Sequence, residues 1–204
     1  MSQAVSALNI VMPLTLEGAV VRLEPIRADH AQLFWEAARD SVDDIFRWIP
    51  YSVKTPADFQ KLVSKALAEQ ERGESVVFAT VERGSGRVIG STRFMNIDRA
   101  NRHLEIGSTW IVPAWQRTAV NTEAKYLMLR HAFEQWNCAR VELKTDAMNQ
   151  KSRAAILRLG AREEGTLRRH MLTWTGRMRD SVYFSILDSE WPEVKTRLQA
   201  KLEG

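Results

Sequence analysis

The sequence contains a single cysteine, Cys138, among 204 residues. One cysteine forms neither an internal disulfide nor a cysteine-cluster metal site, and its isolation favours a reducing, cytoplasmic setting. No apolar run is long enough to cross a membrane. Residues 1–18 lack the basic region and the clean apolar core of a signal peptide. The four histidines show no metal-ligand spacing, so we expect no metal and no membrane partner.

The sequence also lacks repeats, low-complexity segments and a Gly/Ser-rich linker. We therefore expect one domain over residues 19–188, with an N-terminal lead-in at 1–18 and a C-terminal helix at 189–204. Neither sign of charge dominates, because the chain contains 29 Lys and Arg residues and 25 Asp and Glu residues, which gives a net charge of +4. No nucleic-acid-binding motif accompanies this modest excess. A single site for an anionic ligand accounts for it equally well.

The most informative stretch is residues 104–136, which we interpret as a strand, a short turn and a helix. Pro113 ends the strand, because proline cannot donate to a ladder. The helix carries an apolar stripe at i, i+3, i+4 and i+7, formed by Leu129, Ala132, Phe133 and Trp136. The turn leaves unpaired N–H groups at the positive end of the helix dipole, where they suit a phosphate.

The remaining patterns predict a mixed order of elements. We expect strands near residues 20–26, 74–82, 87–96, 140–145, 162–172 and 179–187, and helices near 29–39, 55–72, 149–159 and 189–202. Asp29, Thr55 and Asn149 are the predicted helix caps. This order indicates an α/β (α+β) domain with one central, mixed and mostly antiparallel twisted sheet, flanked by helices.

Several local patterns occur in the order found in the GNAT superfamily of acetyl-CoA-dependent N-acetyltransferases, which the sequence resembles over roughly residues 14–187. The run Leu104-Glu105-Ile106-Gly107 is similar to the family's central strand. The pyrophosphate-loop pattern Gln-x-x-Gly-x-Gly-Thr-Glu-Ala is matched at Gln116, Thr122, Glu123 and Ala124. The stretch 149–160 is similar to the second cofactor motif. The opening residues, 14–38, are similar to the branch that includes the bacterial ribosomal-protein N-terminal (alanine) acetyltransferases.

Two departures from the family pattern concern the chemistry. The two loop glycines are Ala119 and Asn121 here, and glycine is what lets a backbone take positive φ beside a phosphate. The tyrosine that many members place seven residues after Asn149, as the general acid, is Ile156 here. The loop is therefore expected to be reshaped, and another group must protonate or stabilise the leaving thiolate.

The resemblance implies that the central strand splays from its neighbour and that Glu105 acts there as the base for the amine. The alternative is a solvent-facing glutamate. Ser108 and Trp110 are assigned by strand alternation to the side of Glu105, where they either line the acceptor pocket or take part in ordinary sheet packing. Further acceptor-site candidates come from the first helix, the loop after it and the late turn, namely Trp35, Trp48 and Trp174.

On the cofactor side, the main-chain groups of Ile111 and Val112 are expected to meet the pantetheine arm, and their N–H groups to polarise the thioester carbonyl. The pyrophosphate cradle is expected from Gln116, Arg117, Thr118, Ala119, Val120, Asn121 and Thr122. Asn149 either caps its helix or binds the pantetheine arm, or does both. The hydroxyl of Ser152 either bonds to the carbonyl of Met148 or supplies the proton to the sulfur.

These expectations describe an acetyl-CoA-dependent N-acetyltransferase that works by direct attack of a primary amine in a ternary complex. The acceptor is a protein N-terminus or a small amine, and transfer of another acyl group such as succinyl stays open. The lost glycines and the missing tyrosine motivate a second hypothesis, a non-catalytic acyl-CoA-binding or regulatory module. A homodimer is expected only from the resemblance.

Overall fold

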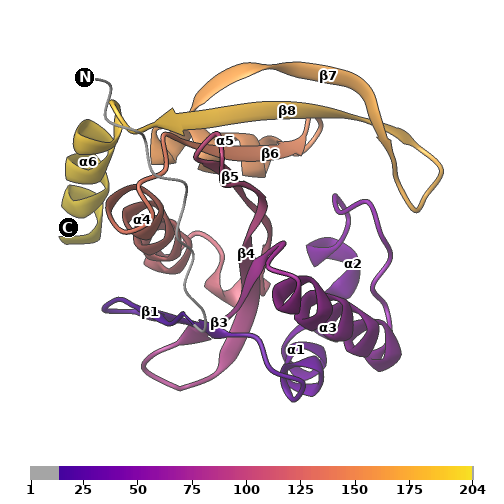
Figure 1. Ribbon diagram of the computed structural model, residues 1–204. Helices are drawn as coiled ribbons and strands as arrows, with labels where there is room; N and C mark the ends of the chain where they lie inside the picture. The colour runs from indigo at the N-terminus through magenta and orange to yellow at the C-terminus, as the bar shows by residue number, and fades with distance from the viewer. Residues whose placement is uncertain (1–13, 204) are drawn as a thin grey trace.

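The computed structural model of the chain describes residues 14–203 (Figure 1). The predicted lead-in lies outside this range up to residue 13. Eight strands form one open sheet in the order β1-β2-β3-β4-β5-β6-β8-β7. They are β1 (Leu16–Glu17), β2 (Val21–Pro25), β3 (Val76–Glu82), β4 (Val88–Asp98), β5 (His103–Ile111), β6 (Arg140–Asp146), β7 (Arg162–Leu172) and β8 (Met178–Leu187). Only β5 and β6 pair in parallel, which confirms the mixed, mostly antiparallel sheet.

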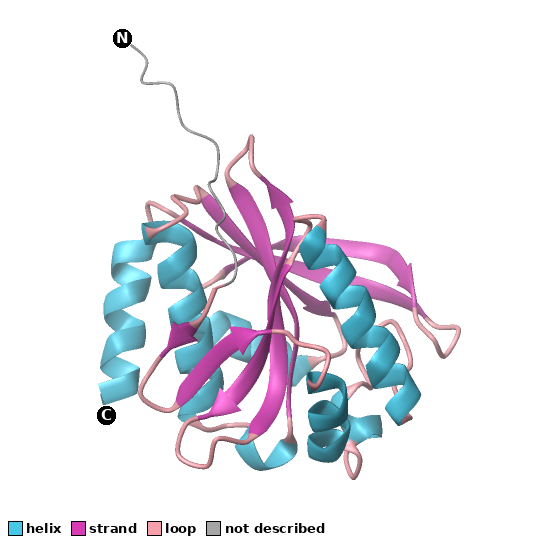
Figure 2. Ribbon diagram, turned by 60° about the horizontal axis from the view of Figure 1, so that its bottom comes forward, coloured by secondary structure: helices cyan, strands magenta, loops and turns pink. Residues whose placement is uncertain are grey.

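Helices cover both faces of the sheet (Figure 2). On one face, α1 (His30–Ala38), the short α2 (Val42–Ile45) and α3 (Pro56–Glu71) form a core with Trp110 of β5. On the other face, α4 (Ala119–Glu134), α5 (Gln150–Leu159) and α6 (Trp191–Glu203) pack in a larger core. The short 3-10 helix η1 (Pro113–Trp115) joins β5 to α4.

Capping explains where two of the predicted helices start. Thr55 and Asp58 form a reciprocal capping box at the start of α3, and the Asn149 side chain caps α5 by accepting from the N–H of Ser152 at 3.1 Å. Asp29 occupies the predicted N-cap position of α1, but its carboxylate makes no capping bond and instead pairs with the Arg27 guanidinium at 3.2 Å.

The N-terminal and C-terminal segments pack into the same core as the rest of the chain. Strand β1 lies before the predicted domain start at residue 19 and pairs with β2, with Leu16 opposite Leu23. Helix α6 lies beyond the predicted end at 188, and it buries Trp191, Val194 and Leu198 in the core shared with α4. The described segments beyond both predicted boundaries therefore form part of one folded unit.

A buried carboxylate fixes α4 to the first strands. Glu123 accepts the backbone N–H groups of Ala19, Val20 and Val21 at 2.7, 2.8 and 2.7 Å. A Cβ atom at Gly18 would lie 2.3 Å from the Glu123 carboxyl carbon, so glycine is required there. The matched Glu123 of the loop pattern is thus structural in this chain.

Candidate active site

The sheet opens between its two parallel strands. The pairing of β5 with β6 starts at His103 opposite Arg140 and stops at Glu105 opposite Glu142. Strand β5 nevertheless continues to Ile111 and β6 to Asp146. The strands therefore separate after Glu105, as the splay predicted for the central strand requires, and β6 leaves the main chain of the second half of β5 without a strand partner on that side.

A bulge in β5 decides which side chains share the face of Glu105. Residues 105 and 110 differ by an odd number, so strict alternation would place them on opposite faces. The register with β4 shifts between the pairs Arg93–Gly107 and Ser91–Trp110, and Ser108 takes a φ of 47° within this shift. The extra residue returns Trp110 to the face of Glu105. The predicted common side is therefore found, but alternation was the wrong reason for it.

Glu105 lies buried at the point where the strands separate, with an exposed fraction of 2%. Its Oε2 accepts from Nδ2 of Asn96 at 2.8 Å and from Nζ of Lys144 at 2.9 Å. Lys144 reaches it from β6, across the opening. A Cβ at Gly107 would lie 2.8 Å from Oε1 of Glu105, so this glycine leaves room for the carboxylate. The solvent-facing alternative for Glu105 is therefore wrong.

Ile111 and Val112 differ in what their main chains can offer. The N–H of Val112 donates to the carbonyl of Ile89 at 2.9 Å, and its carbonyl accepts from the N–H of Trp115 at 3.0 Å. Both groups of Val112 are occupied, so the expected role for its N–H is wrong. Neighbouring residues of a strand point their main-chain groups in opposite directions, so the N–H of Ile111 points away from β4, into the opening. Only Ile111 presents the predicted donor.

The turn before α4 is built without a glycine. Arg117 takes a φ of 63°, and its exposed guanidinium makes no ion pair with any residue in the range 14–203. Nε2 of Gln116 folds back to the Ile111 carbonyl at 2.9 Å. Thr118 donates to the Trp115 carbonyl at 2.8 Å and caps α4 by accepting from the N–H of Val120 at 3.3 Å. Gln116 and Thr118 thus shape the turn, and Arg117 projects from it.

The residues at the former glycine positions already belong to α4. Ala119 is the first residue of this helix and Asn121 lies in its first turn. Neither has a positive φ, so neither position needs glycine in this chain. The side chain of Val120 is buried, whereas Ala119 is exposed and Asn121 and Thr122 are half-buried. The first N–H groups of α4 still face the end of the helix, where an anion is favoured.

Helix α5 presents a hydroxyl but no phenol. Ser152 is half-buried, and among the described residues its Oγ has no hydrogen-bond partner, so the expected bond to the Met148 carbonyl is not formed. Ile156 is buried in the core. Ser152 is therefore the polar group that this face of α5 has in place of the family's tyrosine.

The tryptophans assigned to the acceptor site lie in different surroundings. Trp110 is 5% exposed and packs against Phe34 and Phe46 at centroid distances of 5.2 and 5.6 Å. Trp35 packs on the ring of Phe59 at 6.2 Å. Both fit the sheet-packing alternative more closely than a pocket lining.

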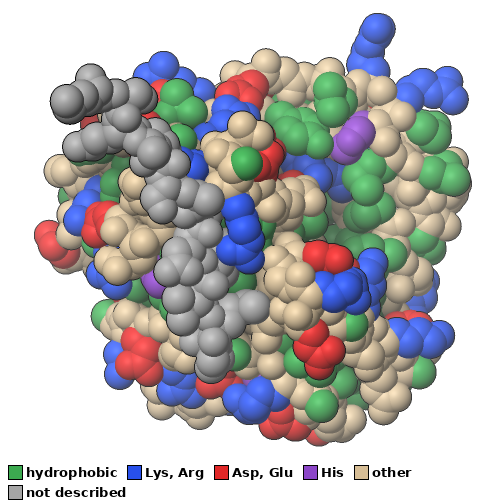
Figure 3. All heavy atoms as spheres, viewed as in Figure 1, with side chains coloured by type: hydrophobic (Ala, Val, Ile, Leu, Met, Phe, Trp, Pro, Cys, Tyr) green, Lys and Arg blue, Asp and Glu red, His purple; other side chains and the backbone are tan. Residues whose placement is uncertain are grey.

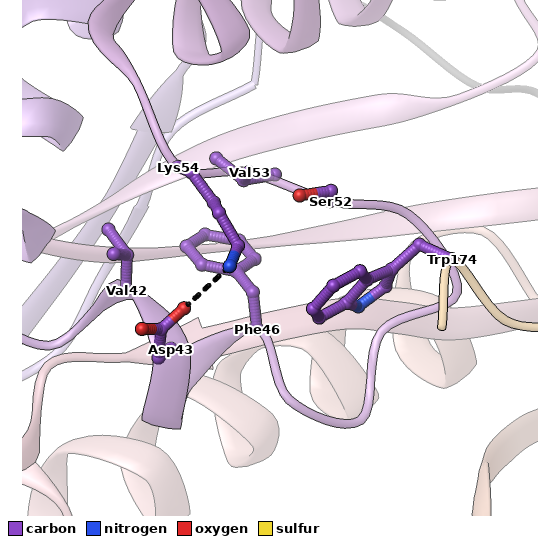
Figure 4. Close-up of a pocket in the computed structure, with 7 residues that line it drawn as sticks. All are labelled: Val42, Asp43, Phe46, Ser52, Val53, Lys54 and Trp174. Atoms are coloured by element: carbon purple, nitrogen blue, oxygen red, sulfur yellow. Dashed lines mark ion pairs between the residues drawn. The ribbon is translucent and has the colours of Figure 1, made fainter. Parts of the chain in front are cut away.

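Trp48 and Trp174 lie where the β7–β8 hairpin approaches the segment that follows α2. Nη1 of Arg179 on β8 donates to the carbonyl of Trp48 at 3.3 Å. Trp174 is in the turn of the β7–β8 hairpin, 44% exposed, with Nζ of Lys54 4.9 Å from its ring centroid. The close-up shows Trp174 facing a small pocket at α2, where Lys54 also pairs with Asp43 at 3.3 Å (Figure 4). The hairpin turn thus reaches the loop that follows α2.

The face of the sheet that carries Glu105 contains further paired charges. Asp146, at the end of β6, is 1% exposed and accepts from the guanidinium of Arg177, with Arg179 at 4.0 Å. Arg93 pairs with Glu69 of α3 at 2.9 Å. The space-filling view shows a hollow below the β7–β8 hairpin, with basic side chains at its base and hydrophobic side chains along its wall (Figure 3).

A buried lysine lies on the other face of β5. Lys125 of α4 is 5% exposed, and its Nζ contacts Oγ1 of Thr92 at 2.9 Å and Oγ1 of Thr109 at 2.6 Å. Burial lowers the pKa of this ammonium to about 7. The sequence interpretation missed Lys125, although it lies four residues before Leu129 on the apolar stripe of the helix. It also missed Lys144 and Asn96, because only the fold brings them to Glu105.

The structure thus defines an α/β domain whose open, mixed sheet separates beside the N-terminus of α4. The model of the acetyltransferase (GNAT) domain family matches residues 21–162, so the chain belongs to the GNAT acetyltransferase family. Members of this family use an acyl-CoA and an amine acceptor. None of the helices within residues 14–203 is long and apolar enough to span a membrane.

Individual relatives agree with this assignment. A GCN5-related N-acetyltransferase from Brucella melitensis is 34% identical, with a TM-score of 0.90 over 98% of this chain and 90% of that chain. RimJ of Mycobacterium smegmatis, solved in complex with CoA-disulfide, is 25% identical, with a TM-score of 0.78 over 89% and 88%. The "Putative ribosomal N-acetyltransferase YdaF" of Bacillus subtilis (strain 168) is 35% identical over 54% of this chain, and this match spans 59% of that protein.

Proposed function

We propose that the protein is an acetyl-CoA-dependent N-acetyltransferase that moves an acetyl group to a primary amine by direct attack in a ternary complex. The observation that supports this most is the position of Glu105, a buried carboxylate at the point where β5 and β6 separate. The cofactor side of the opening offers the N-terminus of α4 and the main chain of Ile111. The acceptor side offers Glu105 beneath the β7–β8 hairpin.

The residues present fit each requirement of acetyl transfer. Arg117 and the first N–H groups of α4 would hold the pyrophosphate of acetyl-CoA, and Asn149 of the second motif would bind its pantetheine arm. The N–H of Ile111 donates to the thioester oxygen as negative charge develops there. Glu105 removes the proton of the acceptor ammonium. The free hydroxyl of Ser152 would donate a hydrogen bond to the leaving thiolate, which is protonated by the second proton that the nitrogen loses after attack.

Lys144 limits how an acceptor amine can reach Glu105, which the sequence did not reveal. Its ammonium already occupies Oε2 of Glu105, at 2.9 Å. An incoming amine therefore exchanges with Lys144 or uses the second oxygen, Oε1. The side chain of Lys144 is mostly buried, and its Nζ lies 5.6 Å from the ring centroid of Tyr183. The pair thus holds the base in place before the acceptor arrives.

The acceptor is proposed to be a protein N-terminus or a small amine. The name of one relative, the putative ribosomal N-acetyltransferase YdaF, points to a ribosomal protein as acceptor, but this name concerns that protein. Transfer of a different acyl group, such as succinyl, is the alternative reaction to compare with acetyl transfer. A cytoplasmic setting and a homodimer are part of the same proposal, and sedimentation of the purified protein tests the second.

The test begins with binding and continues with turnover. We expect acetyl-CoA to raise the melting temperature and at least one amine or N-terminal peptide in a panel to release free thiol. Succinyl-CoA in the same panel tests the acyl group. Stabilisation without turnover by any acceptor would support a non-catalytic acyl-CoA-binding module instead. If acetyl-CoA gives no stabilisation, both proposals fail.

Two substitutions test the assigned roles. Glu105→Gln should lower turnover at neutral pH by about 100-fold or more and leave acetyl-CoA affinity nearly unchanged. Ser152→Ala should also lower turnover. Glu74→Gln, at an exposed glutamate after α3, is the matched control and should behave as the wild type. An unchanged pH–rate profile in Glu105→Gln would remove this residue from the role of base, and full activity in Ser152→Ala would return that hydroxyl to a structural role.

A further inference from the structure

Lys125 is a buried cation that the proposed reaction does not use. It is the seventh residue of α4, the helix whose first turn is assigned to the cofactor phosphates. Its Nζ contacts the hydroxyls of Thr92 on β4 and Thr109 on β5, which also bond to each other at 2.8 Å. Thr109 directly follows the bulge at Ser108. Lys125 therefore connects the phosphate end of the cofactor site to the strand that receives the acyl end.

The charged side chains on the elements around Lys125 point away from its ammonium or bind other partners. On α4, Glu123 is turned to the N–H groups of residues 19–21. On β5, Glu105 lies on the opposite face and pairs with Lys144. On β4, Arg93 also lies on that face. Within residues 14–203, Lys125 thus forms no ion pair, and its described hydrogen-bond partners are two neutral hydroxyls.

Resting on the proposed function, we propose that Lys125 is a cofactor-binding charge, which takes up a proton when the phosphates of acyl-CoA bind at the start of α4. Ala119 and Lys125 are six residues apart, which is about 9 Å along a helix axis. Over such a distance through protein, phosphate charges favour the ammonium over the neutral amine. The protonated Lys125 then attracts the bound phosphates in return.

The proposal predicts a linkage between pH and affinity. In the free protein, burial holds the pKa of Lys125 at about 7, so the amine is mostly neutral at pH 8. If the bound phosphates raise this pKa by about one unit, binding takes up about 0.4 proton at pH 8. The affinity for acetyl-CoA should then fall by about fivefold between pH 7 and pH 9.

Calorimetric titration of acetyl-CoA without acceptor tests this. Titrations at pH 8 in HEPES and in Tris, which differ in ionisation enthalpy and contain no phosphate to compete for the site, give the number of protons taken up. The full-length protein is compared with Lys125→Met, Lys125→Arg and the control Lys65→Met, whose lysine is exposed on α3. Lys125→Met should bind acetyl-CoA without taking up a proton. Its affinity at pH 7 should equal the lower affinity that the wild type has at pH 9. Lys125→Arg keeps the charge, so it should bind without uptake and with the same affinity at both pH values.

The outcomes separate this inference from the proposed function. Uptake in the wild type and Lys65→Met that is absent from Lys125→Met supports the inference. Equal uptake in wild type and Lys125→Met, or none in the wild type, overturns it while acetyl-CoA binding stands. Failure of acetyl-CoA to bind at any pH overturns the proposed function, and this inference with it.

Discussion

The buried position of Lys125 predicts a stability that depends on pH in a defined direction. Its pKa falls from 10.5 in the unfolded chain to about 7 in the folded protein. Between these values the unfolded chain binds the extra proton, so the free energy of unfolding rises with pH. The two titration curves give an increase of about 2 kcal/mol between pH 7 and pH 9. Well below pH 7 both states are protonated, and this contribution no longer changes.

Lys125→Met removes this titration while it keeps a long apolar side chain in the core. Thr92 and Thr109 already bond to each other, so neither hydroxyl is left without a partner. Urea unfolding at pH 7, 8 and 9 measures the free energies for both proteins, and their difference cancels other titrating groups such as Cys138. Burial raises the pKa of that thiol to about 12, which acts in the opposite direction near pH 9. A variant whose free energy of unfolding runs parallel to the wild type across this range would refute the reasoning.

Three further changes test the geometry. Gly107→Ala places a methyl group 2.8 Å from Oε1 of Glu105 and should lower turnover by about 100-fold, with acetyl-CoA affinity retained; wild-type turnover would show that the position of Glu105 is not critical. Glu123→Ala leaves three N–H groups without their acceptor and should lower the free energy of unfolding, measured in urea, by about 3 kcal/mol. A decrease below about 1 kcal/mol would contradict the view that Glu123 fixes α4 to the first strands. Ala119→Gly with Asn121→Gly should leave acetyl-CoA affinity unchanged and cost about 1–2 kcal/mol of stability, whereas tighter binding would show that the turn needs glycine.

The sequence was sufficient to predict the helices and strands, because the patterns that mark each of them lie within a few neighbouring residues. The capping box at Thr55, the stripe on α4 and the strand patterns each fix an element within a few residues. The order of these elements, together with the motif spacings, indicated the family. The family resemblance in turn implied that the central strand separates from its neighbour. The capping bond expected at Asp29 is not formed, because its carboxylate has a closer partner in Arg27, two residues away.

The site was less predictable, because it depends on contacts between distant elements. Lys144 meets Glu105 from 39 residues away, and no local pattern marks that pair. The bulge at Ser108 also has no clear signal, since serine rarely takes a positive φ. The occupied N–H of Val112 follows from the register of β4 with β5, which sequence periodicity does not give. The stripe on α4, in contrast, could have identified Lys125 as a lysine on an apolar face.

The distribution of paired and unpaired charge divides the opening into two halves. On the acceptor side the carboxylates have cationic partners, as in Glu105 with Lys144 and Asp146 with Arg177. On the cofactor side Arg117 makes no ion pair with any described residue, and Lys125 contacts only neutral hydroxyls. A polyanion bound at the turn before α4 would compensate the charge of Arg117, whereas an acceptor ammonium either replaces Lys144 on Oε2 of Glu105 or uses Oε1. If the proposed function holds, this asymmetry predicts that acyl-CoA binds before the amine, because the Arg117 guanidinium has no ion-pair partner among the described residues to give up.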